Sequence, residues 1–229
     1  MRTDSSGRPM VADGFRSPLA LSGRYIELVP LSLDHAAELA RAAADPEVGR
    51  FLRDPPGPTE AITAALIRLV LADQANGTDL AFATRLRPAG PAIGMTRYLR
   101  IDRPNHAVEI GGTWIDPRYW RTPVNTESKL LLLRHAFDDE RVHRVQIQTD
   151  LRNERSQRAI ERLGAVREAV LREDVRLRTG YVRSSVIYSI LESEWPAVRR
   201  RLEEALARPS NLPPPAPGAD RTTAPAGRP

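Results

Sequence analysis

Residues 115–128 read Ile-Asp-Pro-Arg-Tyr-Trp-Arg-Thr-Pro-Val-Asn-Thr-Glu-Ser, and this stretch decides the fold of the chain. It follows an apolar run at 107–115 that is typical of a β-strand, and it leads into a pattern that predicts a helix from about 124 to 137. Pro123 fits the first turn of that helix because its missing N–H has no partner there. The free N–H groups and the dipole of a helix N-terminus attract anions, so this loop is a candidate anion-binding site that needs no lysine.

Downstream of this loop, the apolar pattern alternates between the two-residue repeat of strands and the 3.6-residue repeat of helices. The pattern predicts a strand, a helix, two strands and a last helix, at residues 144–149, 153–163, 165–178, 181–191 and 195–206. Because the helix at 124–137 joins two predicted strands, we expect a parallel crossover.

Upstream of the loop, the same alternation continues. Strand patterns occupy residues 24–31, 80–86 and 92–101, and helix patterns occupy 33–40, 45–52 and 59–76. Ser32 and Thr59 are in place to cap two of these helices. The helix that starts at Thr59 is expected to bury Ile62, Leu66, Leu69 and Val70.

A single domain at residues 18–207 contains all of these elements, because roughly 150 to 200 residues can bury one core. The predicted fold class is α/β, of the α+β kind, with a mixed, mostly antiparallel sheet of six to seven strands and helices on both faces. Residues 1–17 are polar and 208–229 are rich in proline, so both ends are expected to be disordered.

Composition excludes several classes of protein. The chain has no cysteine, which excludes a disulfide scaffold and a thiolate nucleophile. It has no secretory signal and no apolar run of the roughly 18 residues that a membrane span needs. We therefore expect a cytoplasmic protein without a membrane partner.

The basic character of the chain is local. Lys129 is the only lysine among 34 basic residues, and the net charge is +5. Between residues 141 and 183 there are 11 arginines against six acids, an excess equal to the whole net charge. This excess indicates either an anionic partner or a solvated surface of ion pairs.

The order of predicted elements and two motifs resemble the GNAT superfamily, and within it the RimJ/RimL-type branch of ribosomal-protein N-terminal acetyltransferases. The loop at 115–128 ends in Thr-Glu-Ser, which is similar to the Thr-Glu-Ala of the branch. Residues 153–165, Asn-Glu-Arg-Ser-Gln-Arg-Ala-Ile-Glu-Arg-Leu-Gly-Ala, resemble its Asn-x-x-Ser helix and closing glycine. The resemblance covers about residues 23–206 and implies the GNAT fold, with a splay between the fourth and fifth predicted strands, at 107–115 and 144–149.

The resemblance implies that the chain binds acetyl-CoA or another acyl-CoA. The superfamily pattern for the pyrophosphate is Gln/Arg-x-x-Gly-x-Gly/Ala, and this sequence has Arg121 and Pro123 where small residues belong. We expect the charges of Arg118 and Arg121 to compensate. The predicted cofactor-binding residues are Thr113, Trp114, Ile115, Arg118, Arg121, Thr122, Val124, Asn125, Thr126 and Asn153.

Gly111 and Gly112 interrupt the strand at 107–115, and paired glycines mark a bulge or the close approach of another backbone. In GNAT proteins the fourth strand is bulged and the pantetheine arm pairs with its free edge. The resemblance therefore implies that the backbone of residues 113–115 holds this arm and polarises the thioester carbonyl. A plain bulge is the alternative.

Two residues are candidates for the chemistry of acyl transfer to an amine. Glu109 is expected to share a face of its strand with Gly111 and Thr113, where it acts as a base through water or only orients the amine. Many GNAT enzymes protonate the leaving thiolate with a tyrosine, but Glu161 occupies that position here. The resemblance assigns this role to Ser156, with Asn153 holding the pantetheine, capping the helix, or both.

The sequence thus predicts an acyl-CoA-dependent N-acyltransferase. It moves an acetyl group, or a succinyl or other acyl group, to the primary amine of a peptide N-terminus or small metabolite. The four histidines lack the spacing of metal ligands, and no metal is expected. The alternative is a catalytically degenerate GNAT-like module that binds nucleic acid or acts as a regulator. Aromatic residues make up only 5% of the chain and do not interleave with the basic block, which disfavours nucleic acid.

The acceptor pocket is expected between residues 45–58 and the last two predicted strands. Neither the identity of the acceptor nor the formation of a homodimer follows from the sequence.

Overall fold

The computed structural model describes residues 15, 19–209 and 212. The predicted extensions at 1–17 and 208–229 therefore lie almost wholly outside the described residues. Two described residues near the ends of the chain, Phe15 and Leu212, pack against the core. The ring of Phe15 meets that of Tyr98 edge-on, with 4.7 Å between the centroids.

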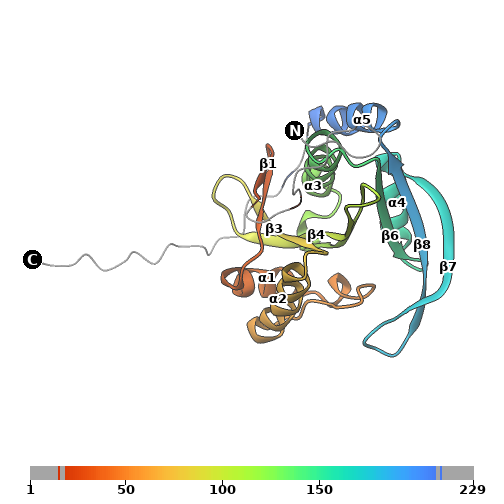
Figure 1. The fold of residues 1–229 in the computed structure, drawn as a ribbon. Helices are drawn as coiled ribbons and strands as arrows, with labels where there is room; N and C mark the ends of the chain where they lie inside the picture. The colour runs from red at the N-terminus through yellow and green to blue at the C-terminus, as the bar shows by residue number, and fades with distance from the viewer. Residues whose placement is uncertain (1–14, 16–18, 210–211, 213–229) are drawn as a thin grey trace, which may run out of the picture.

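An eight-stranded sheet forms the centre of the fold, in the order β1-β2-β3-β4-β5-β6-β8-β7 (Figure 1). Its strands are β1 (Leu21–Ser22), β2 (Ile26–Pro30), β3 (Leu80–Leu86), β4 (Ala92–Asp102), β5 (Ala107–Ile115), β6 (Arg144–Asp150), β7 (Val166–Arg176) and β8 (Val182–Leu191). Neighbours are antiparallel except β5 and β6, which are parallel. The predicted crossover and mixed sheet are confirmed. The eighth strand is the two-residue β1, too short to leave a periodic signal in the sequence.

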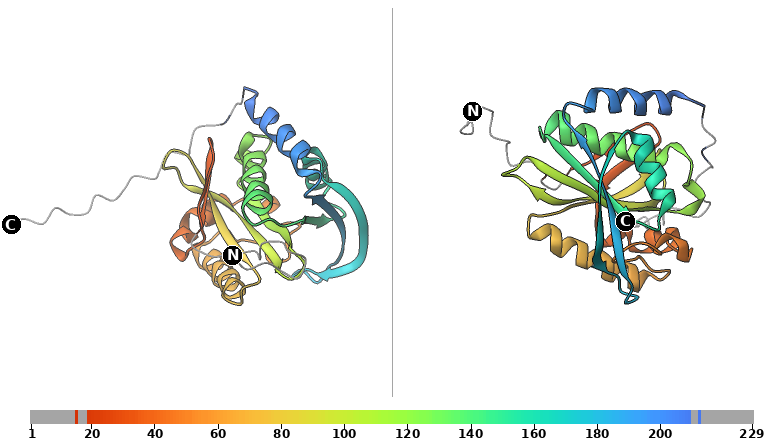
Figure 2. Two further views of the ribbon diagram at one scale, coloured as in Figure 1. Left: turned by 45° about the horizontal axis from the view of Figure 1, so that its top comes forward. Right: turned by 90° about the vertical axis from the view of Figure 1, so that its right-hand side faces the viewer.

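Helices cover both faces of the sheet, as predicted (Figure 2). They are α1 (Ala36–Ala42), α2 (Glu60–Ala75), α3 (Pro123–Arg134), α4 (Glu154–Leu163) and α5 (Trp195–Ala207). Short helical turns are η1 (Leu33–His35), η2 (Pro46–Val48), η3 (Pro117–Tyr119) and η4 (His135–Asp139), the last extending α3 as a π-helix. One apolar cluster lies under α1 and α2, and a larger one lies under α3, α4 and α5.

The buried face of α2 differs from the prediction. Ile62 and Leu69 are 51% and 40% exposed. The helix buries Leu66 and Val70, as predicted, but its other buried residues are Thr63 and Ile67. The hydroxyl of Thr63 donates to the carbonyl oxygen of Gly57, which allows this polar side chain to be buried. The stripe is therefore rotated by about one residue from the one that hydrophobicity alone indicates.

Glu127, in the loop-to-helix motif, anchors α3 to the start of the sheet. Its buried carboxylate accepts three hydrogen bonds from the backbone N–H groups of Arg24, Tyr25 and Ile26, at 2.6, 2.7 and 2.8 Å. A Cβ atom on Gly23 would lie 2.3 Å from the same carboxyl carbon. The Thr-Glu motif thus positions α3 through a contact more than 100 residues away in sequence.

Across the described part of the chain, no helix is both long and apolar enough to cross a membrane.

Candidate active site

The sheet opens between β5 and β6. These strands pair at only three positions, from Ala107 opposite Arg144 to Glu109 opposite Gln146. Beyond them β5 continues to Ile115 and β6 to Asp150 without further pairing to each other. Figure 1 shows β6, β8 and β7 turned away from β3 and β4. The predicted splay is confirmed, and it leaves the edge of β5 available to another backbone.

A β-bulge lies in β5 at the splay, as the paired glycines indicated. Met95 pairs with Trp114 and Arg97 with Gly111, so β5 has one extra residue there. Gly112 has a φ of +57°, a conformation that glycine adopts without strain. A Cβ atom at this position would lie 2.7 Å from Nε of Arg97.

Because of this extra residue, the side chain of Thr113 points to the opposite face of the sheet from the one that regular alternation predicts. Its hydroxyl contacts the Thr96 hydroxyl at 2.8 Å and accepts a hydrogen bond from Lys129 of α3 at 2.7 Å. Glu109 lies on the other face, because its neighbours in β5 on either side belong to the core under α3. The prediction that Glu109 and Thr113 share a face is therefore wrong, since a bulge shifts the alternation by one residue.

Lys129 was not among the predicted site residues. This single lysine of the chain is 5% exposed. Burial lowers the pKa of its amine from 10.5 to about 7, and no carboxylate among the described residues offsets the change. An arginine could not lose its charge in the same place. The only signal in the sequence was that one basic position in 34 is not arginine.

Glu109 lies at the point where the splay begins. Its side chain is buried, Arg100 Nη1 lies 3.1 Å from Oε2, and the amide of Gln146 donates to Oε2 at 3.4 Å. Burial raises the pKa of Glu109, and the charge of Arg100 opposes this shift. A carboxylate with a raised pKa next to an open sheet edge suits general-base chemistry.

The loop before α3 holds its two arginines differently. Arg118 is bound by Asp116, with its Nε 3.0 and 3.1 Å from the two carboxylate oxygens, and this hydrogen bonding raises the pKa of Arg118. Arg121 is exposed and has a φ of +62°. It adopts the left-handed conformation at the position where the superfamily has glycine. Thr122 caps α3 by accepting the N–H of Val124 at 3.4 Å.

At the other side of the splay, Asn153 caps α4. Its Oδ1 accepts the N–H of Ser156 at 3.1 Å, so the predicted capping role is confirmed. Ser156 is half-buried in the first turn, and its hydroxyl makes no hydrogen bond to the described residues. Glu161, where many relatives have tyrosine, accepts a hydrogen bond from the Tyr188 hydroxyl at 3.0 Å. Burial and this carboxylate raise the pKa of Tyr188 to about 12, which makes it a poor acid.

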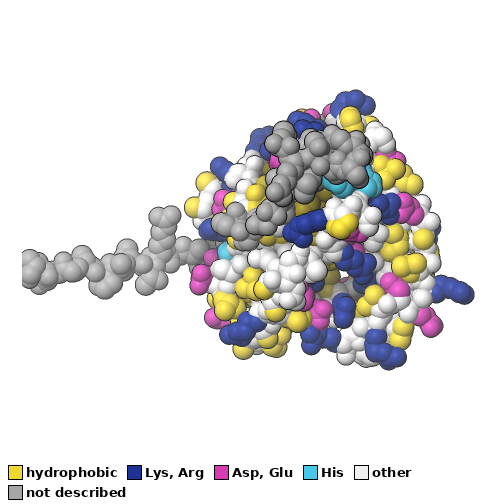
Figure 3. Space-filling model, in the orientation of Figure 1, with side chains coloured by type: hydrophobic (Ala, Val, Ile, Leu, Met, Phe, Trp, Pro, Cys, Tyr) yellow, Lys and Arg dark blue, Asp and Glu magenta, His cyan; other side chains and the backbone are white. Residues whose placement is uncertain are grey.

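Residues 45–58 meet the β7–β8 hairpin, as the predicted acceptor pocket requires. Arg178 Nη2 lies 2.8 Å from Oδ1 of Asp54, and Arg183 Nη1 donates to the Phe51 carbonyl oxygen at 3.3 Å. The guanidinium of Arg152 lies over the ring of Tyr181 at 3.6 Å. Figure 3 shows a hollow on this face with Lys or Arg side chains along its edge.

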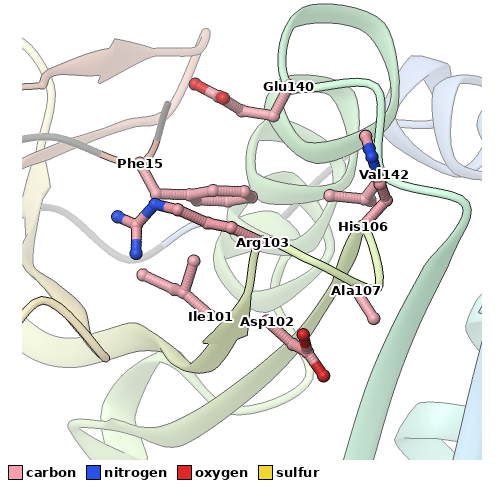
Figure 4. A pocket seen from close by; sticks show the side chains of 8 residues that line it. All are labelled: Phe15, Ile101, Asp102, Arg103, His106, Ala107, Glu140 and Val142. Atoms are coloured by element: carbon pink, nitrogen blue, oxygen red, sulfur yellow. The ribbon is translucent and has the colours of Figure 1, made fainter. Parts of the chain in front are cut away.

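A small cavity of about 10 Å³ lies elsewhere, at the start of β5 (Figure 4). Phe15, Ile101 and Val142 supply its apolar walls. It lies next to Ala107, at the opposite end of β5 from Ile115, and therefore does not belong to the splay. No group of three or more His, Cys, Asp or Glu side chains suitable for a metal ion occurs among the residues that the structure describes.

The chain resembles known acetyltransferases in sequence. Residues 26–166, more than half of the chain, match the family model of the acetyltransferase (GNAT) domain. "Putative ribosomal N-acetyltransferase YdaF" of Bacillus subtilis (strain 168) is 30% identical over 106 residues, which are 46% of this chain and 57% of that protein. The chain thus spans little more than half the length of this curated relative.

Solved structures share the fold. A "putative acetyltransferase" from T. thermophilus is 41% identical with a TM-score of 0.77, over 83% of this chain and 98% of that one. Mycobacterium smegmatis RimJ in complex with CoA-disulfide has a TM-score of 0.70 at 19% identity, over 82% of this chain and 95% of that one. On its sequence, its open sheet and these relatives, the chain belongs to the GNAT acetyltransferase family.

Proposed function

We propose that this protein is an N-acetyltransferase that moves an acetyl group from acetyl-CoA to a primary amine by direct attack. The observation that carries the proposal is the splay between β5 and β6, beside a bulged strand whose edge is unpaired from Ile110 to Ile115. The family membership of the chain supports the same reaction.

The residues around the splay fit a coenzyme A thioester. The edge of β5 that is unpaired with β6 at residues 113–115 offers backbone N–H and C=O groups to the amides of the pantetheine arm, although the Ile115 carbonyl oxygen also accepts the Trp120 indole N–H. The start of α3 would hold the pyrophosphate through the backbone N–H groups of Asn125 and Thr126, together with that of Arg121 in the loop at 118–123. The N–H of Val124 is shared with its Thr122 cap. Asn153, already the cap of α4, keeps its amide nitrogen for the arm. The cofactor supplies an activated acyl group and a thiolate leaving group.

Glu109 and Ser156 would carry out the proton transfers. Glu109 accepts a proton from the acceptor amine through water, because its raised pKa keeps it a usable base near neutral pH. A backbone N–H at the bulge polarises the thioester carbonyl as the amine attacks. The C–S bond then breaks, and the hydroxyl of Ser156 would give its proton to the departing thiolate. The proton taken up by Glu109 would return to Ser156 Oγ through water.

The acceptor would bind on the face of Glu109, between residues 45–58 and the β7–β8 hairpin. Arg100, Arg152 and Arg183 lie on this side, against the carboxylates of Glu109 and Asp150. A peptide N-terminus is our proposed acceptor, because YdaF is named a ribosomal N-acetyltransferase. An open cleft also accommodates a chain that continues beyond its first residue.

An acceptor screen tests the proposal. The protein is incubated with acetyl-CoA and a library of peptide N-termini and small primary amines, and release of free thiol is followed together with the mass of the acceptor. We expect thiol release that depends on the acceptor, with acetylated peptide as product. Thiol release at the same rate with and without every acceptor would contradict an N-acetyltransferase. Acetylation of small amines alone would contradict the peptide acceptor.

A further inference from the structure

Trp120 stands at the end of β5, between the strand and α3. Its indole Nε1 donates to the carbonyl oxygen of Ile115 at 3.1 Å, which fixes the ring beside the last residue of the strand. The ring also packs against both apolar clusters of the core. Trp120 immediately precedes Arg121 and the Thr122 cap of α3, so it belongs to the loop proposed to hold the pyrophosphate.

Arg155 reaches this ring from the other side of the splay. It lies in the first turn of α4, which follows β6, and its guanidinium carbon is 3.4 Å from the centre of the Trp120 ring. This stack joins the end of β5 to the start of α4, across the mouth of the opening between β5 and β6. Chain segments on either side of the splay therefore meet at one cation–π contact.

The charge of Arg155 has no direct partner. Within the described part of the chain, no carboxylate lies within 4.0 Å of its guanidinium. Arg155 as a whole is exposed, yet desolvation where its guanidinium packs lowers the pKa of Arg155, and the charges of Glu47 and Asp45 only partly oppose this. A guanidinium that has lost part of its water without gaining a counterion favours the binding of an anion that can still reach it.

The other basic candidates near the loop are less suited to this role. Arg118 is occupied by Asp116. Arg121 is exposed, and no ring or carboxylate among the described residues holds its guanidinium in one place. The Arg155 guanidinium rests on the Trp120 ring, and its N–H groups make no hydrogen bond to the described residues. These donors form the fork that can bind two phosphate oxygens at once.

We propose that Arg155 binds the pyrophosphate of coenzyme A from the α4 side, opposite the backbone N–H groups of α3. This assignment rests on the proposed function, since it needs the cofactor in the splay. Arg155 then closes the mouth of the opening over the bound arm, with Trp120 as its platform.

Calorimetric titration tests the proposal with three ligands: coenzyme A, 3′-dephospho-coenzyme A and pantetheine. Arg155→Gln is compared with Arg158→Gln, which removes an arginine one turn along the same helix that pairs with Glu154 at 3.0 Å and is 63% exposed. We expect Arg155→Gln to weaken the binding of coenzyme A and of 3′-dephospho-coenzyme A, which both contain the pyrophosphate, by about 10- to 100-fold. This is the usual cost of losing hydrogen bonds to a charged group. The affinity of Arg155→Gln for pantetheine should stay within about twofold of wild type. The affinities of Arg158→Gln for all three ligands should also stay within about twofold of wild type. Unchanged melting temperatures establish that both variants fold.

Each other outcome has a definite meaning. Equal coenzyme A affinity in wild type and Arg155→Gln overturns the proposal. A loss confined to coenzyme A, with 3′-dephospho-coenzyme A unaffected, also overturns it by assigning Arg155 to the 3′-phosphate. An equal loss for pantetheine overturns it too, because Arg155 then acts on the arm or on the fold instead. Wild-type protein that binds none of the three ligands overturns the proposed function, and this assignment with it.

Discussion

Lys129 is an amine held in the core with a hydroxyl as its hydrogen-bond partner. It lies on α3 and donates to Thr113, which is in the bulge of β5. The contact therefore joins the helix at the pyrophosphate loop to the strand proposed to hold pantetheine. An amine whose pKa is about 7 gains or loses its proton near neutral pH.

The lowered pKa of Lys129 makes the stability of the protein depend on pH. The unfolded chain holds this proton up to about pH 10.4, whereas the folded protein releases it near pH 7. Stability should therefore rise as the pH increases from about 7 to about 10, because only the unfolded state still binds the proton. Below pH 7 the full cost of the buried charge is present, on the order of 5 kcal/mol at about 1.4 kcal/mol per pKa unit.

Lys129→Met removes this cost and should stabilise the protein most below pH 7. Urea denaturation at pH 6, 8 and 10 measures the effect, and the gain should shrink as the pH rises. Lys129→Arg is the control, because its charge persists at every pH, so its destabilisation relative to wild type should grow as the pH rises. A gain from Lys129→Met that is the same at all three pH values would mean that the amine is not perturbed.

As the proposed base, Glu109 is expected to set the pH dependence of the reaction. Burial raises its pKa, so its carboxylate forms, and activity rises, at a higher pH than for an exposed glutamate. In the pH profile of kcat/KM we expect Glu109→Gln to flatten this rising limb. Arg100→Gln, which removes the opposing charge 3.1 Å away, should move the limb to higher pH. If Glu109→Gln raises KM and leaves the shape of the profile unchanged, Glu109 only orients the amine.

At the scale of elements, the bulge in β5 determines what the strand presents to the splay. Gly112→Ala places a Cβ atom 2.7 Å from Nε of Arg97 and a side chain on a φ of +57°. We expect a loss of about 2 to 4 kcal/mol in unfolding free energy and weaker coenzyme A binding. Gly77→Ala is the matched control, since its φ is +77° but nothing lies within 4 Å of the new atom. Equal losses in the two variants would show that the bulge tolerates a side chain.

Helix α4 presents Ser156 in its first turn, beside the Asn153 cap. If its hydroxyl protonates the thiolate, Ser156→Ala should lower kcat by about 10² to 10⁴ while coenzyme A affinity stays similar. Single-turnover kinetics give the rate of the chemical step directly. A wild-type rate for that step would leave the thiolate to depart with help from water or the backbone.

The positions of the strands and helices follow from the sequence, but the face on which some of their side chains lie does not. Periodicity located β5 and β6, and Gly111-Gly112 indicated the bulge, yet alternation across the bulge placed Thr113 on the wrong face. In α2 the hydroxyl of Thr63 is satisfied by the Gly57 carbonyl oxygen, a contact that no hydrophobic pattern encodes. Both errors arise because local irregularity and side-chain hydrogen bonds change which side of an element is buried.

Predictions about the site differ in the same way. The position of Glu109 beside the splay and the capping role of Asn153 could be predicted, because their spacing from the glycines and from Ser156 is fixed along one element. Lys129 and Arg155 were missed, because their significance lies in contacts with Thr113 and Trp120 on other elements. Such contacts exist only once the strands and helices are packed.

At the scale of the whole molecule, several arginines of the basic region are paired with carboxylates. Arg144, Arg152 and Arg178 pair with carboxylates within 4.0 Å. Glu168 binds Arg144 so closely that its pKa falls to about 2. The cations near the splay and the β7–β8 hairpin that have no carboxylate partner among the described residues, such as Arg155, therefore contribute most to the positive potential there.

Hydrogen–deuterium exchange with and without coenzyme A tests most directly whether the splay between β5 and β6 holds the cofactor. We expect coenzyme A to slow exchange in residues 110–126, which contain the free edge of β5 and the start of α3, and in the first turn of α4. The edge strand β7, at Val166–Arg176, should exchange at the same rate in both conditions. Binding of coenzyme A that leaves residues 110–126 unprotected, or that protects β7 instead, would contradict a cofactor site in the splay.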